Sequence, residues 1–149
     1  MRLSRFVTFA LVAAVGASLA ACGSATSSPS AASSPAAAAD GSIAVELSEW
    51  KVSPAQVSAA AGSITFTVSN EGSQTHEFVV VKTDTKADAL TVVGDKIDES
   101  TLTPVDEIED IAVGATPTLT VDLAAGHYVL LCNIETHYGQ GMRADFDVK

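Results

Sequence analysis

The chain has 149 residues, of which 8 are basic and 18 are acidic, so its formal net charge is −10. The phosphate backbone of a nucleic acid repels such a chain, and no basic patch is available for anionic lipids, so we exclude nucleic-acid binding and electrostatic membrane binding. Once a targeting segment is removed, the length suits one modest domain.

Residues 1–21 have the pattern of a bacterial lipoprotein signal peptide. Arg2 and Arg5 form a basic start, Phe6–Ala17 is an apolar run, and the segment ends in Leu-Ala-Ala before Cys22, which resembles a lipobox. The apolar run is too short for a comfortable membrane-spanning helix. In lipobox signals the cysteine becomes the first mature residue and carries the lipid, so we expect lipidation of Cys22. A plain signal peptide cut nearby, or an uncleaved anchor, is the alternative.

The next segment, residues 22–40, is composed almost entirely of Ser, Ala and Pro, with one charge at Asp40. This composition cannot bury enough apolar surface to offset the entropy of ordering, so we expect a flexible, lipid-anchored linker. A linker of this length spans on the order of 23 Å on average. The sequence therefore predicts an exported protein, anchored by lipid to the bacterial cell membrane, with its domain on the extracytoplasmic side.

Cysteine usage draws attention to one residue of the remaining domain, residues 41–149. The chain has 2 cysteines, Cys22 and Cys132. If Cys22 carries the lipid, Cys132 has no intramolecular disulfide partner. A lone thiol in an oxidising compartment is a liability unless it is buried or occupied, so we expect Cys132 to have a function.

The domain consists of short runs in which apolar and polar residues alternate, bounded by turn residues, which is typical of β-strands. Turn signals fall at Ala60–Gly62, Asn70–Gly72, Gly114 and Ala125–Gly126. Several short strands at this spacing predict an all-β fold, a Greek-key sandwich or barrel. The expected strands are 43–48, 64–69, 78–81, 118–122, 128–132 and 144–148.

Residues 84–110 interrupt this pattern. Lys86–Val93 could form a short helix, and beyond it acids dominate, with Lys96 as the one base. An acidic loop or short-helix excursion between strands, exposed to solvent, is the simpler interpretation, while a docking or solubility surface remains open. The acids are Asp95, Asp98, Glu99, Asp106, Glu107, Glu109 and Asp110.

The stretch LLCNIETHYGQGMRADF, residues 130–146, places Cys132, His137 and Met142 at equal spacing, with four residues between neighbours. Soft sulfur ligands select copper, while imidazole suits copper and zinc alike. Blue-copper centres use two histidines and one cysteine in a plane with a weak axial methionine, so this stretch offers three of four ligands. The alternative is that Cys132 and Met142 are ordinary core residues.

Two histidines remain as partners. His127 stands five residues before Cys132 on the same expected strand, which places it on the opposite face and roughly 16 Å away. We therefore expect His127 to be an ordinary surface or turn histidine. His76 follows an Asn-Glu-Gly turn at the start of a strand, so it can meet the loop if both strand ends lie at one pole.

The segments VSNEGSQTHEFVVV and HYVLLCNIETHYGQGMRADFDV resemble the cupredoxins, small blue copper proteins of the plastocyanin and azurin type. The resemblance covers essentially all of residues 41–149, and the Cys-x4-His-x4-Met spacing is similar to that of auracyanin-like and sulfocyanin-like members. It implies a Greek-key β-barrel and one type 1 copper ion per chain. The implied metal ligands are His76, Cys132, His137 and Met142.

The function implied by this resemblance is single-electron transfer by Cu(I)/Cu(II) cycling in a membrane-tethered monomer. The partner would be a redox protein, such as a cytochrome or oxidase, within reach of the linker. We expect no enzymatic activity, because copper oxidases and nitrite reductases need a second copper site with more histidines than the 3 present. A metal-bound Cys132 is also no free nucleophile. The alternative is a copper-binding or copper-delivery lipoprotein without an electron-transfer role.

Four positions depart from the pattern of the relatives. Glu135 and Thr136 stand where relatives often have Pro-Gly before the second histidine, and we expect the charge of Glu135 to lower the reduction potential by favouring Cu(II). Glu77 stands where relatives often have Asn, so its role in knitting the loops together is open. Thr75 stands where azurins have Gly, which leaves open whether a carbonyl oxygen also binds the metal.

Overall fold

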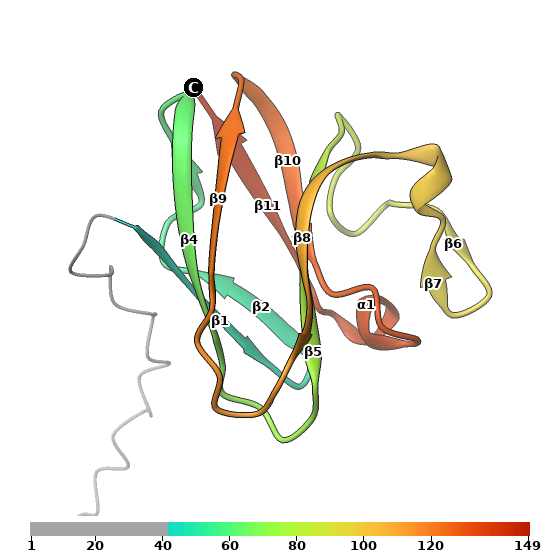
Figure 1. Ribbon diagram of the computed structural model, residues 1–149. Helices are drawn as coiled ribbons and strands as arrows, with labels where there is room; N and C mark the ends of the chain where they lie inside the picture. The colour runs from blue at the N-terminus through green and yellow to red at the C-terminus, as the bar shows by residue number, and fades with distance from the viewer. Residues whose placement is uncertain (1–41) are drawn as a thin grey trace, which may run out of the picture. The chain divides into compact units, whose positions relative to one another are not determined.

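The computed structural model describes residues 42–149, and the expected signal peptide, Cys22 and linker lie outside this part. Two β-sheets pack face to face as a sandwich, with a small third sheet at one side (Figure 1). Within residues 42–149 there is no helix of the length and apolar character that a bilayer crossing requires.

The first sheet has four strands, and its spatial order departs from the sequence order. Its strands, in spatial order, are β2 (Lys51–Pro54), β1 (Ile43–Ser48), β4 (Gly62–Asn70) and β9 (Thr118–Leu123). β1 and β4 pair in parallel, whereas the other pairs of this sheet are antiparallel.

The second sheet has five strands, and the ends of two of these strands carry residues of the site described below. Its spatial order is β3 (Ser58–Ala59), β11 (Arg143–Val148), β10 (Gly126–Leu131), β5 (His76–Lys82) and β8 (Thr103–Ile111). Only the short pairing of β3 with β11 is parallel. The expected all-β Greek-key sandwich is confirmed, with two parallel pairings added to the antiparallel ones.

The core between the sheets follows from the alternation in the sequence. Each inward-facing residue of β1, β4 and β9 is buried, while its neighbours are partly or fully exposed. Phe66 lies at the centre, with its ring centroid 5.4 Å from that of Phe78 and 5.5 Å from that of Phe146. Each such aromatic side chain buries about 150–250 Å², more than a smaller apolar side chain, so these rings contribute strongly to the core.

Strand β10 is buried on both faces, which explains its continuous apolar sequence. Tyr128 and Leu130 face the core between the sheets, whereas Val129 and Leu131 belong to a second cluster on the outer face. β5 is buried on both sides for the same reason. The outer cluster is covered by residues 83–102, which we call the excursion.

The short helix that the sequence allowed at Lys86–Val93 does not form. The chain makes one turn there, and the excursion then forms the hairpin β6 (Val92–Val93) and β7 (Lys96–Ile97) and the 3-10 helix η1 (Glu99–Thr101). The Tyr138 hydroxyl donates to the Ala87 carbonyl and accepts from the Leu90 N–H. A tertiary contact thus takes the backbone groups that a continuing helix would pair internally.

The excursion is also shorter than expected, because residues 103–111 form strand β8. This strand pairs with β5 at the edge of the second sheet, and of its residues only Ile111 is buried. Its acids face solvent, so it lacks the apolar alternation by which a strand is recognised. Charged residues on an edge strand also oppose pairing with further chains.

Candidate metal centre

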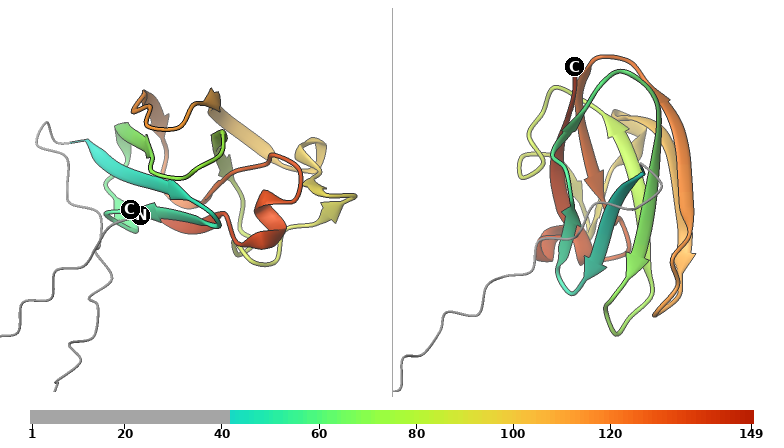
Figure 2. Two further views of the ribbon diagram at one scale, coloured as in Figure 1. Left: turned by 90° about the horizontal axis from the view of Figure 1, so that it is seen from below. Right: turned by 90° about the vertical axis from the view of Figure 1, so that its left-hand side faces the viewer.

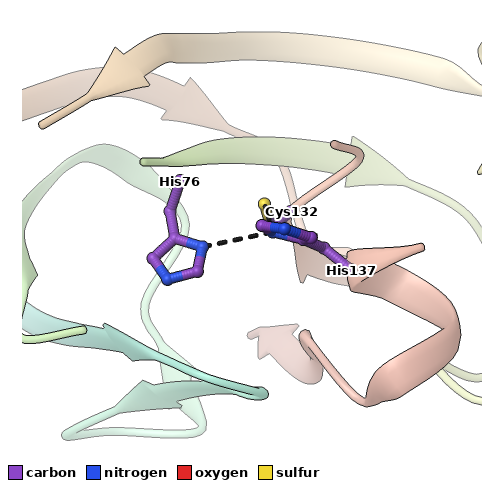
Figure 3. A group of neighbouring side chains, drawn as sticks. All are labelled: His76, Cys132 and His137. Atoms are coloured by element: carbon purple, nitrogen blue, oxygen red, sulfur yellow. Dashed lines mark hydrogen bonds between the residues drawn. The ribbon is translucent and has the colours of Figure 1, made fainter. Parts of the chain in front are cut away.

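Three of the expected ligands come together at one end of the sandwich (Figure 3). His76 is the first residue of β5, Cys132 directly follows β10, and His137 begins the short helix α1 (His137–Gln140). The Nδ1 atoms of His76 and His137 are 3.2 Å apart, and Cys132 Sγ lies 3.4 Å from His137 Nδ1. All three side chains are buried, and their donor atoms lie within 4.8 Å of one another.

The turn before β5 sets the position of His76. The buried side chain of Asn70 donates from Nδ2 to the carbonyl oxygens of Gln74 and Ile111, each at 2.8 Å, and its Oδ1 accepts from the Gly72 N–H at 3.0 Å. These bonds join both ends of the turn to β8. A register shift in the pairing of β5 with β8 follows directly after His76, a place where bulges commonly aim side chains into sites.

The loop from Cys132 to Met142 is closed by its own backbone. The Cys132 N–H donates to the Met142 carbonyl, and the Met142 N–H donates to the His137 carbonyl, each at 3.1 Å. The His137 N–H donates to the Ile134 carbonyl at 3.0 Å. Cys132, His137 and Met142 are therefore linked in pairs by the backbone.

Met142 is fully buried in the core between the sheets, as is Cys132. The structure thus places the fourth expected ligand in the same loop and the same core as the other sulfur ligand. Its role as an axial ligand stays a prediction.

The protonation state of the free site suits a metal at His137, whereas Cys132 must first lose its proton. The pKa of His137 is lowered by burial and by the nearby His76, so the neutral imidazole, with a lone pair to donate, is favoured. Burial raises the pKa of the Cys132 thiol, although N–H groups of Glu77 and Ile134 oppose this. A metal must therefore displace the thiol proton, which makes metal binding pH-dependent.

The separations also fit a metal ion. With metal–nitrogen bonds of about 2.0 Å and metal–sulfur bonds of about 2.3 Å, neighbouring ligand atoms lie about 3.3–3.8 Å apart. The separations of 3.2 Å and 3.4 Å are close to this range. One sulfur and two imidazoles suit copper and zinc.

Two residues at the site escaped the sequence reasoning, Glu49 and Trp50, which connect β1 to β2. Glu49 Oε1 lies 3.1 Å from His76 Nε2. The Trp50 ring meets His137 edge to face, with ring centroids 5.0 Å apart. Their place directly after the first expected strand, and the presence of a single Trp in the chain, were the available signals.

Glu77, which stands where relatives often have Asn, contacts the ligand loop. Its backbone N–H donates to Cys132 Sγ at 3.4 Å. Burial raises the pKa of its carboxyl group, while a hydrogen bond from the Asn133 N–H partly offsets this. Glu77 thus contacts two consecutive residues of the ligand loop, one through its backbone and one through its side chain.

His127 lies away from the three donors, as expected from its parity. It is not a surface histidine, however, because its side chain is only 14% exposed. Nδ1 lies 2.6 Å from the Thr83 carbonyl oxygen and Nε2 lies 2.8 Å from Asp145 Oδ1. Both ring nitrogens face oxygen acceptors, so His127 fastens the excursion to β10 and β11.

Comparison with known proteins agrees with this picture. The sequence profile of the cupredoxin-like domain matches residues 11–142. A comparison with curated proteins found no match.

Among solved structures, the dithionite-reduced auracyanin of Roseiflexus castenholzii is 22% identical, with a TM-score of 0.52 over 71% of this chain and 94% of its own. Auracyanin A of Chloroflexus aurantiacus, described as a blue copper protein, is 21% identical, with a TM-score of 0.53 over 72% of this chain and 98% of its own. At these identities the likeness establishes the fold.

Proposed function

This chain belongs to the cupredoxin-like domain family, and on that premise we propose that it is a membrane-tethered type 1 (blue) copper protein. It carries single electrons between redox partners by cycling between Cu(I) and Cu(II). The observation that carries this proposal is the buried cluster of His76, Cys132 and His137. Met142 would be the fourth ligand, and each chain would hold one copper ion.

Copper is favoured over zinc by the soft ligands. A thiolate with a thioether suits copper, whereas structural zinc sites use combinations of Cys and His alone. When bound, copper supplies a one-electron redox couple. The chain supplies two imidazoles and a sulfur that are already close together, so little rearrangement accompanies the change of oxidation state.

Electron transfer is favoured over catalysis and over copper delivery. His76 and Cys132 are 0% exposed and His137 is 5% exposed, so neither a substrate nor a recipient protein can approach the ligands freely. The remaining histidine, His127, is engaged by Thr83 and Asp145. His137, the most exposed of the three, is the exit for the electron.

The location and partners follow from the sequence. Lipid attachment at Cys22 and the linker 22–40 hold the domain on the extracytoplasmic side of the bacterial membrane. The chain works as a monomer, and its partner is a redox protein, a cytochrome or an oxidase, that lies within reach of the linker. Labelling with a radioactive fatty acid, compared between the natural chain and Cys22→Ala, tests the anchor.

The metal centre is tested by adding Cu(II) to the full chain purified in detergent. We expect an intense visible band from thiolate-to-copper charge transfer, and Cys132→Ser should abolish it. A colourless product with wild-type protein would refute the proposal.

Reduction and reoxidation then separate the two copper functions. Retention of copper through repeated cycles supports electron transfer. Loss of copper to a Cu(I) chelator on reduction would instead favour copper delivery.

A further inference from the structure

The Glu49 carboxylate connects two backbone N–H groups to one ligand side chain. It accepts from the Ser73 N–H at 2.9 Å and from the Gln74 N–H at 3.0 Å, and its Oε1 lies 3.1 Å from His76 Nε2. The Glu49 side chain is 23% exposed, while that of His76 is 0% exposed. The contact therefore lies at the border between the buried ligand and the surface.

This contact decides which nitrogen of His76 carries the proton. An ionised carboxylate can only accept hydrogen bonds, so Nε2 must donate to it. In the neutral imidazole the lone pair then resides on Nδ1. Nδ1 is the atom that faces His137, at 3.2 Å, so the lone pair points into the metal centre (Figure 3).

Close packing around the Glu49 carboxylate restricts its movement away from His76. Gly72 lies so close that a Cβ atom there would be 2.5 Å from Glu49 Oε1 and 2.9 Å from His76 Nε2. The next residue, Trp50, contacts the other histidine, His137. The connection between β1 and β2 therefore touches both imidazoles of the site.

We propose that Glu49 is a positioning residue of the metal centre, which holds His76 in the Nε2–H tautomer with Nδ1 directed at the metal. The proposal rests on the copper function proposed above. Groups that receive the second N–H of a ligand histidine commonly change metal affinity 10–100-fold when removed. Its place after the first expected strand does not show that Glu49 meets His76, which lies 27 positions further along the chain, so the contact is found only in the structure.

The first measurement uses Cu(II) as the probe and the full chain in detergent micelles, with affinity measured by competition against a chelator. Glu49→Ala should weaken Cu(II) binding about 10–100-fold. Glu49→Gln keeps a carbonyl oxygen that can accept from Nε2, so its affinity should stay within about threefold of wild type. Glu71→Ala is the control, because it removes an exposed carboxylate from the turn whose N–H groups bind Glu49, and its affinity should equal that of wild type.

The second measurement needs no metal. Nitrogen-15 NMR of the imidazole rings in the metal-free chain should report the Nε2–H tautomer for His76 in wild type. Glu49→Ala should give a mixture of tautomers. Thermal unfolding of each metal-free variant identifies any change that comes from the stability of the turn alone.

The outcomes separate this proposal from the copper function. Wild-type protein that takes up no Cu(II) would refute the copper function, while the ring NMR still decides the role of Glu49. An Nδ1–H tautomer in wild type, a Glu49→Ala affinity equal to that of Glu71→Ala, or a Glu49→Gln affinity as weak as that of Glu49→Ala would overturn the proposal.

Discussion

The ligand loop, residues 132–142, has two sides that differ in what they contact. Its inner side carries Cys132 and His137 and faces His76 and Trp50. Its outer side packs on the excursion, and α1 lies beside the hairpin β6–β7 (Figure 2).

The outer side is tied by hydrogen bonds within the protein. Asn133 Oδ1 accepts from the Ile97 N–H at 2.7 Å, and its Nδ2 donates to Glu99 Oε1 at 2.6 Å. The Thr136 N–H donates to the Asp95 carbonyl at 2.8 Å. The Tyr138 hydroxyl bonds to the excursion in both directions.

The difference between the two sides of the loop explains how the site can form without a bound metal. Every buried side-chain nitrogen and oxygen of residues 42–149 has a hydrogen-bond partner. The outer side therefore holds the loop in place without a metal. On the inner side a thiol and two imidazoles converge, and these are groups that a metal ion can bind. We therefore expect metal affinity to depend on the residues of the inner side. We expect the stability of the metal-free fold to depend on the hydrogen bonds of the outer side.

The largest expected difference is between alanine substitutions of a ligand histidine and of a histidine outside the metal centre. His76→Ala removes an inner ligand, so we expect loss of the visible copper band and a Cu(II) affinity at least tenfold weaker. His127→Ala removes contacts that attach the excursion to β10 and β11, outside the ligand loop, so it should keep the band, while thermal unfolding shows a loss of stability. Absorption spectroscopy and calorimetry on both variants test this expectation. Loss of the copper band in both variants would show that metal binding and folding do not depend on separate residues.

Next in size is Tyr138→Phe, which keeps the ring and removes the hydroxyl. The Ala87 carbonyl and the Leu90 N–H then lose their partner on the outer side, which costs about 1–3 kcal/mol of unfolding free energy. Urea unfolding of the metal-free chain measures this loss. The copper spectrum should not change, and a shifted spectrum would show that the outer side also controls the ligands.

Acid should weaken the attachment of the excursion to β11 by a smaller amount. Burial opposes ionisation of Asp145, but hydrogen bonds from the Ala87 N–H and His127 hold its pKa below the usual value. A lowered pKa contributes stability above the ordinary pKa of about 3.9, and this contribution is lost as pH falls through the folded-state value. Because the side chain is 42% exposed, we expect less than about 1 kcal/mol.

The measurement for Asp145 is unfolding free energy between pH 7 and pH 3 for wild type and Asp145→Asn. The variant should be less stable at pH 7, and the difference should shrink in acid. A constant difference at all pH values would refute the assignment.

The smallest effect is expected at Glu135, which is exposed within the ligand loop. Loss of its negative charge in Glu135→Gln disfavours Cu(II), so the reduction potential should rise by less than about 60 mV, the value for a tenfold change in a one-electron equilibrium. Voltammetry of Asp122→Asn, an exposed acid on β9, provides the control. No upward shift, or an equal shift in the control, would refute the role of Glu135.

Local patterns determined much of this protein. Alternating apolar residues predicted the inner strands, because a strand that faces a core on one side must repeat every two residues. The position of His127 on the opposite face of its strand excluded it as a metal ligand. Spacing and side-chain chemistry selected Cys132, His137 and Met142 as candidate ligands. His76 was found because it follows a turn and begins a strand.

Other features were decided only by tertiary structure. β8 has almost no buried face of its own, and its strand form depends on pairing with β5. The turn at residues 86–90 is set by the Tyr138 hydroxyl, far along the chain. Glu49 meets His76 only because β1 and the start of β5 lie at the same pole. In each case the determining partner is distant in sequence, so no local periodicity or spacing records it.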